Sequence, residues 1–93
     1  MEIRYDKLPE HMQGGARRYI EHGIAPGHFL TAVLENNFVR AFMCADETNT
    51  ARMRDWADWL YNDAPGGCHG SRDRVEAWIE AGGMNGPNGG PVT

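Results

Sequence analysis

Two glycines followed by two arginines form the first segment of the chain that could bind a ligand. Gly14 and Gly15 stand just before Arg17 and Arg18, within a stretch whose apolar residues have helical spacing. Glycine lets a planar ligand lie against the backbone, and a guanidinium can hold the phosphate of that ligand. Alternatively, the glycines accommodate a crossing helix and the arginines are solvated. Both interpretations are open at this point.

A Pro-Gly turn introduces the second candidate segment. Pro26 and Gly27 precede a short apolar run that begins at His28, so the free backbone amides of a helix start could hold an anion such as phosphate. His28 and Thr31 could add donors to the same anion, and Arg72 follows a similar turn. The pattern is also ordinary for a loop, because every helix has such an end and neither GxxxxGK[ST] nor GxGxxG occurs.

Catalytic and metal-binding chemistry has little support in the sequence. Cys44 and Cys68 are too few for a disulfide scaffold and form no CxxC pair for zinc. Cys68 and His69 are residue types that can form a nucleophilic pair, but their spacing does not support such a site. Paired carboxylates and histidines at metal-binding spacing are not evident. We therefore expect no enzymatic activity, no catalytic residue, no metal and no cofactor.

The composition describes one small domain. The 93 residues are 41% hydrophobic and 24% charged, which leaves no room for a second core. The net charge is −4 and the basic residues are spread evenly, which argues against a general nucleic-acid binder. Apolar runs fall far below the roughly 20 residues that span a bilayer, and the N-terminus lacks a signal-peptide pattern. We expect a cytoplasmic protein that contacts neither membrane nor nucleic acid polymer.

Helical periodicity predicts an all-α fold, a small compact bundle of four to five short helices. We expect one domain over residues 1–83 and a disordered, Gly/Pro-rich tail over 84–93. The predicted helices are residues 8–22, 28–34, about 38–46, a fourth that starts at Asp46 or Thr48 and runs to about 61, and 71–82.

The tryptophans and an apolar helix face near the middle of the chain indicate which residues pack in the core or between subunits. Trp56 and Trp78 follow the apolar stripes of their helices, whereas Trp59 lies off the stripe and could serve an interface or stack on a ligand, although the core is favoured for the set. The third helix carries an apolar face formed by Phe38, Val39, Phe42, Met43 and Ala45. Three tryptophans and two glycines within a helix, in so short a chain, predict a symmetric homo-oligomer.

A longer pattern resembles a known group of proteins. It consists of LPEHMQGG at residues 8–15, RYIEHGI at 18–24, PG at 26–27, FLTAVL at 29–34, WLYN at 59–62, AP at 64–65, Cys68, and GS at 70–71. This pattern resembles a widespread group of small accessory proteins encoded by tailed phages and prophages. Similar phage proteins include sponges that sequester the nucleotide signals of bacterial immunity.

The resemblance implies a counter-defence protein in the host cytoplasm. Its partner would be a nucleotide second messenger of host immunity, either a cyclic oligonucleotide or an ADP-ribose-type signal, bound without cleavage. The binding residues expected from the sequence are Gly14, Gly15, Arg17, Arg18, Gly27, His28 and Thr31.

Two other classes of function remain open. A protein–protein inhibitor of a host defence complex, similar to an anti-CRISPR, would use the acidic surface around Asp55, Asp58 and Asp63 to engage a basic groove. A structural or regulatory phage protein would need no ligand at all.

Overall fold

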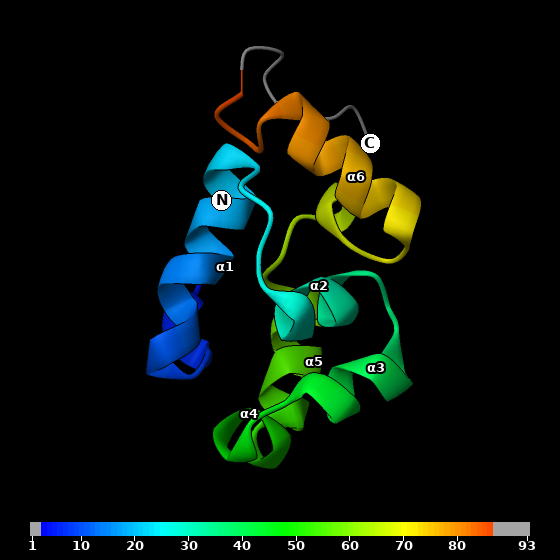
Figure 1. Cartoon of the computed structure of the whole chain (residues 1–93). Coiled ribbons are helices and arrows are strands. Elements are labelled where there is room, and N and C mark those ends of the chain that lie inside the picture. The colour runs from blue at the N-terminus through cyan, green and yellow to red at the C-terminus, as the bar shows by residue number, and fades with distance from the viewer. Residues whose placement is uncertain (1–2, 87–93) are drawn as a thin grey trace.

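The computed structural model describes residues 3–86 and builds them from helices alone (Figure 1). The elements are η1 (Tyr5–Lys7), α1 (Glu10–His22), α2 (His28–Leu34), α3 (Phe38–Cys44), α4 (Glu47–Ala51), α5 (Met53–Asn62), η2 (Gly66–Cys68) and α6 (Arg72–Ala81). The all-α prediction is confirmed. No helix in this part of the chain is long and apolar enough to cross a membrane.

The helix count differs from the prediction at one place. The predicted fourth helix is divided into α4 and α5 by Arg52, whose backbone leaves the helical region at φ −112° and ψ 22°. The Arg52 guanidinium donates to the backbone carbonyl of Lys7 at 2.7 Å and to Asp55 at 2.8 Å. These bonds fix the non-helical backbone of Arg52 beside the N-terminal residues. The described part of the chain therefore contains six α-helices instead of the four to five expected.

Three helices begin at residues whose side chains cap them. Asn37, Asp46 and Ser71 each accept a hydrogen bond from the backbone amide three residues further on, at 3.2, 2.7 and 3.2 Å. Each cap satisfies one amide that has no partner inside its own helix. The caps therefore fix where α3, α4 and α6 start.

The close approach of two backbones occurs at Gly23 and Gly83, where α1 and α6 end side by side (Figure 1). Both glycines have positive φ, 67° and 73°. A Cβ on Gly23 would lie 2.7 Å from the Gly83 nitrogen. Next to them, the amides of Met84 and Asn85 donate to the carbonyls of Ile20 and Glu21, both at 2.9 Å.

These hydrogen bonds of Met84 and Asn85 lie just beyond the domain boundary that the sequence predicts at residue 83. The structure describes residues 84–86, which the sequence placed in a disordered tail, and the remainder of that tail lies outside the described residues.

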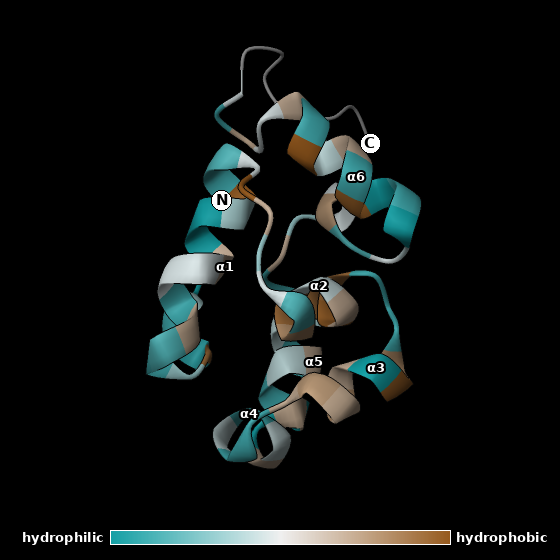
Figure 2. Ribbon diagram, in the orientation of Figure 1, coloured by the Kyte–Doolittle hydropathy of each residue, from teal (hydrophilic) through white to brown (hydrophobic). Residues whose placement is uncertain are grey.

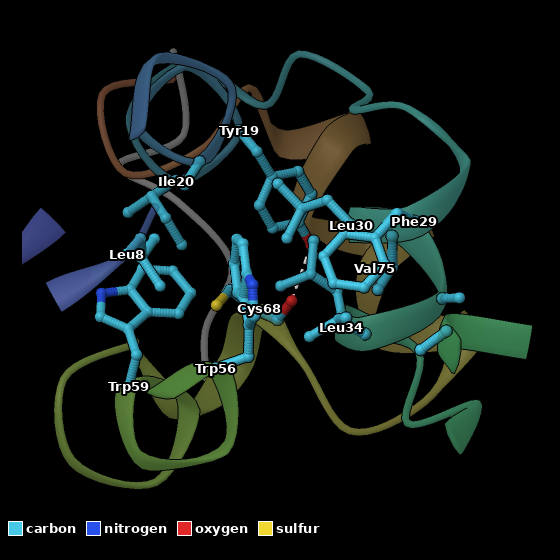
Figure 3. Packing of buried hydrophobic residues seen from close by; sticks show 14 of the residues in the cluster. Leu8, Tyr19, Ile20, Phe29, Leu30, Leu34, Trp56, Trp59, Cys68 and Val75 are labelled. Atoms are coloured by element: carbon cyan, nitrogen blue, oxygen red, sulfur yellow. Dashed lines mark hydrogen bonds between the residues drawn. The ribbon is translucent and has the colours of Figure 1, made fainter. Parts of the chain in front are cut away.

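The core forms where α1, α2, α5 and α6 meet (Figure 3). Trp56, Trp59 and Trp78 are all buried, at 1%, 0% and 3% exposure, so Trp59 belongs to the core. The Trp56 indole donates to the Asn49 side chain at 3.1 Å, and the Trp78 indole donates to the Tyr19 carbonyl at 3.0 Å. These bonds tie the aromatic core to α4 and to the end of α1.

The apolar face predicted for α3 is turned to solvent instead of to the core. Only Ala41 of this helix is buried, while Phe38, Val39 and Met43 are 70%, 70% and 80% exposed. Coloured by hydropathy, α3 is mostly hydrophobic along its length (Figure 2).

Candidate functional site

A hollow between α1 and the loop to α2 contains three of the residues expected to bind a ligand. Gly15 and Arg18 come from α1, and Gly27 comes from the loop that precedes α2. The hollow has a volume of about 320 Å³. We call it the α1–α2 hollow.

The floor of the α1–α2 hollow is apolar. Met12, Ile24 and Leu30 line it together with Ala25, Pro26 and Gly27 of the loop. Leu30 is buried. Ile24, a large aliphatic residue in the loop, is 51% exposed. The loop leaves α1 through Gly23, whose left-handed conformation turns the chain back along the helix. An isoleucine directly after a glycine that ends a helix, as in Gly23-Ile24, is a sequence signal that could have marked this floor.

The guanidinium of Arg18 lies over the two glycines of α1. A Cβ at Gly14 would come within 3.1 Å of Arg18 Nη1, so the absence of a side chain at Gly14 gives the guanidinium its place. Within residues 3–86, the Arg18 side chain makes no ion pair or hydrogen bond. No other described helix crosses at Gly14 or Gly15, since among residues 3–86 only Arg18 atoms lie within 4 Å of a Cβ built there.

Arg17 points to a different side of the same helix. Its guanidinium lies 4.7 Å from the centre of the Tyr5 ring and 3.8 Å from the Glu21 carboxylate. Consecutive residues of an α-helix are separated by about 100° around its axis, which accounts for the divergence. The structure thus brings Arg18 but not Arg17 to the hollow.

His11 lies at the rim of the α1–α2 hollow and connects it to α4. Its Nε2 atom is 2.9 Å from the Asp46 carboxylate. Asp46 also accepts the amide hydrogen of Asn49, and these hydrogen bonds hold the pKa of Asp46 below its ordinary value. No serine, threonine, tyrosine or cysteine is among the described residues that line this hollow.

His28 and Thr31 line a second hollow, between α2, α3 and α6, with a volume of about 710 Å³. It also contains Arg40 and Arg72, with the carboxylates of Glu35 and Glu76. Arg72 is paired with Glu76 at 3.1 Å, so positive and negative groups largely offset one another here.

The start of α2 offers little to an anion. The Thr31 hydroxyl donates to the Pro26 carbonyl at 3.3 Å, and α2 has only seven residues. Five residues of the predicted set are therefore divided between two hollows that both contain Pro26, and Gly14 and Arg17 line neither of them.

The acidic residues considered for a protein inhibitor are paired with basic ones. Lys7 contacts Asp63 at 2.6 Å and Asp58 at 3.3 Å, and Arg52 contacts Asp55 at 2.8 Å. This arrangement leaves less free negative charge than the sequence indicated.

Cys68 is placed in the core and not at a reactive surface. It is 0% exposed, and burial raises the pKa of its thiol to about 12. The thiolate is the nucleophilic form of cysteine, so this thiol is poorly suited to attack a substrate near neutral pH. Among residues 3–86, no group of three histidine, cysteine or acidic side chains is arranged to hold a metal ion.

The described residues form a small all-α fold with two surface hollows beside α2. Comparisons with family models, curated proteins and solved structures give no match.

Proposed function

We propose that the protein binds a phosphorylated nucleotide in the α1–α2 hollow and sequesters it without cleaving it. The observation that carries this proposal is Arg18, a guanidinium with no carboxylate partner in the described chain, at the edge of a hollow with an apolar floor. A phosphate would pair with the guanidinium through charge-assisted hydrogen bonds. The base would lie against Met12, Ile24 and Leu30.

The size of the α1–α2 hollow limits the ligand. Its volume of about 320 Å³ stands at the lower end of the range of about 300–1,000 Å³ typical of small-molecule sites. One nucleotide unit fits this range, so a larger signal would place one of its units here. The ligand class is a nucleotide signal of host immunity, in accord with the resemblance to phage-encoded sponges.

The groups that line the hollow favour binding without cleavage. Hydrolysis of a phosphodiester is assisted by a nucleophile, a metal or a pair of acid–base groups. Here His11 is the one acid–base group of the described lining, and it faces Asp46. A single histidine supports recognition of a phosphate more readily than a turnover reaction.

Calorimetric titration with AMP, ADP-ribose, and cyclic di- and trinucleotides tests the proposal. Arg18→Ala should weaken binding by about ten- to hundredfold, the loss expected for a charge-assisted hydrogen bond. Arg17→Ala is the matched control, because it removes the same charge one residue away but outside the hollow. Equal losses in both variants would reduce the effect to net charge and would contradict the site.

Recovery of the ligand separates sequestration from catalysis. The complex is incubated, the protein is denatured by heat, and the released ligand is identified by mass spectrometry. Intact ligand in stoichiometric amount supports sequestration. Hydrolysed ligand would instead make His11 and Asp46 the groups to examine. Absence of binding to every member of the panel at micromolar concentration would overturn the proposal.

A further inference from the structure

The hollow between α2, α3 and α6, which we call the α2–α3–α6 hollow, is larger than the α1–α2 hollow and adjoins it. Its volume of about 710 Å³ lies well inside the range of about 300–1,000 Å³ typical of small-molecule sites. Pro26 lines both hollows, so the two meet at this residue. A ligand longer than one nucleotide unit can therefore extend from the α1–α2 hollow into its neighbour.

Two side chains of opposite charge line the α2–α3–α6 hollow, and neither makes an ion pair or a side-chain hydrogen bond among residues 3–86. One is Arg40 of α3. The other is Glu35, which directly follows α2 and is partly buried. Taking an unpaired carboxylate out of water costs free energy, which a bound hydrogen-bond donor would offset. The hollow thus presents one group suited to an anion and one suited to a donor.

The ion pair between Arg72 and Glu76 of α6 adds little to the charge of this hollow. The two side chains are 3.1 Å apart and are 79% and 60% exposed. An exposed pair of this kind is screened by solvent and has no net charge. Arg40 and Glu35 therefore determine which ligand groups the hollow attracts.

A guanine nucleotide carries the groups that complement Arg40 and Glu35. Its phosphate can be held by a guanidinium through charge-assisted hydrogen bonds. The N1–H and N2–H₂ groups of guanine are adjacent donors on one edge of the base, and a carboxylate has two acceptor oxygens to receive them. Adenine has a single amino group on that edge, beside the acceptor N1, which a carboxylate repels. A carboxylate in this position therefore favours guanine over adenine.

We infer that the α2–α3–α6 hollow binds the second, guanine-containing unit of a dinucleotide whose first unit lies in the α1–α2 hollow, an inference that rests on the proposed function. One phosphate of the ligand pairs with Arg18 and the other with Arg40, and the ligand passes Pro26 between them. The ligand class is thereby narrowed from a phosphorylated nucleotide to a dinucleotide with at least one guanine.

Calorimetric titration with AMP, cyclic di-AMP and cyclic di-GMP tests the second subsite. Cyclic di-GMP should bind as one molecule per chain, at least about tenfold more tightly than the other two probes, because it alone places a guanine beside Glu35. Arg40→Ala should weaken the binding of cyclic di-GMP by about ten- to hundredfold, the loss expected for a charge-assisted hydrogen bond, and should leave the affinity for AMP unchanged.

Arg54→Ala is the matched control for Arg40→Ala. Arg54 is an exposed arginine of α5 that lines neither of the two hollows, so its removal changes the net charge equally and should leave the binding of cyclic di-GMP unchanged. Circular dichroism checks that each variant is folded, and Arg40→Gln provides a second variant should Arg40→Ala fail to fold.

Glu35→Gln tests the base preference. The side-chain amide of glutamine offers one acceptor and one donor, which match the amino group and N1 of adenine. The variant should therefore bind cyclic di-GMP about tenfold more weakly than the wild type and should bind cyclic di-AMP at least as tightly as the wild type does. An unchanged preference for cyclic di-GMP would contradict the role given to Glu35 and overturn the guanine assignment.

Comparison of Arg18→Ala with Arg40→Ala separates the two hollows. If Arg18→Ala weakens the binding of cyclic di-GMP and Arg40→Ala does not, the proposed function stands and the second subsite is overturned. Equal affinities of the wild type for AMP and cyclic di-GMP, or two molecules of cyclic di-GMP per chain, would also overturn the second subsite alone. Absence of binding to all three probes would overturn the proposed function and the second subsite together.

Discussion

Arg17 and Arg18 show how neighbouring residues of the same type acquire different roles. Arg17 lies against Tyr5 and Glu21, whereas Arg18 lies over Gly14 beside the α1–α2 hollow. The sequence predicted that this pair could bind a phosphate, but it could not assign the role to one of them. That choice depends on which face of α1 packs on η1, and no local spacing reports it.

A buried hydrogen bond from the Tyr19 hydroxyl contributes to stability. Tyr19 is 0% exposed and donates to the backbone carbonyl of Cys68 at 2.7 Å (Figure 3). Tyr19→Phe leaves that carbonyl without its donor and should lower the free energy of unfolding by about 1–3 kcal/mol. Urea denaturation measures the loss. Tyr61→Phe, at an 89% exposed position, is the control and should change little.

His69 makes stability depend on pH. Burial, followed by the charge of Arg74, lowers the pKa of His69 below its ordinary value of 6.5. The unfolded chain therefore binds a proton more readily than the folded chain, and the contribution of His69 to stability falls as the pH drops through 6.5 toward the lower folded-state pKa.

Denaturation midpoints between about pH 7.5 and 5.5 measure this dependence. His69→Gln should flatten the profile, and His28→Gln, at an exposed position, should leave it unchanged. A steep profile retained in His69→Gln would assign the pH dependence to other groups.

At the scale of the elements, periodicity located most helices and missed one break. The residues on both sides of Arg52 are compatible with a helix, so the local pattern gave no reason to end one there. The break depends on the Arg52 bond to the Lys7 carbonyl, a contact across 45 positions. It also lets Asn49 reach the Trp56 indole. Contacts between distant segments are the part of the fold that the sequence pattern did not report.

The sequence predicted only some of the residues that line the α1–α2 hollow. Gly15, Arg18 and Gly27 were among the expected residues, but the apolar floor of Met12, Ile24 and Leu30 was not. The floor exists because the loop after Gly23 folds back on α1, and this return path is set by tertiary packing.

The contact between the ends of α1 and α6 predicts a selective sensitivity to glycine substitution. Gly83→Ala adds a Cβ that would lie 2.5 Å from the Gly23 nitrogen, at a position with φ of 73°. We expect a loss of about 2–4 kcal/mol from overpacking and backbone strain. Gly66→Ala should cost less than about 0.5 kcal/mol, because no described residue other than its chain neighbours lies within 4 Å of its added Cβ. Thermal unfolding of the two variants gives the comparison.

At the scale of the whole molecule, the segment that follows α6 joins the C-terminal helix to the N-terminal helix α1. The described part measures 37 × 24 × 19 Å, with a core shared among short helices. In so small a domain each tie between distant segments is a large fraction of the total stability. The Met84 and Asn85 amides bond to the end of α1, so they join the last helix to the first.

Truncation tests this closure. A chain that ends at residue 86 keeps the bonds from Met84 to Ile20 and from Asn85 to Glu21, whereas a chain that ends at residue 83 loses both. At about 0.5–1.5 kcal/mol for each bond, the two bonds contribute about 1–3 kcal/mol, and the shorter chain should unfold roughly 4–24 °C below the longer one. Differential scanning calorimetry at equal concentration measures the difference. Equal melting temperatures would mean that α6 is held to α1 by its side chains alone, chiefly by the Trp78 indole.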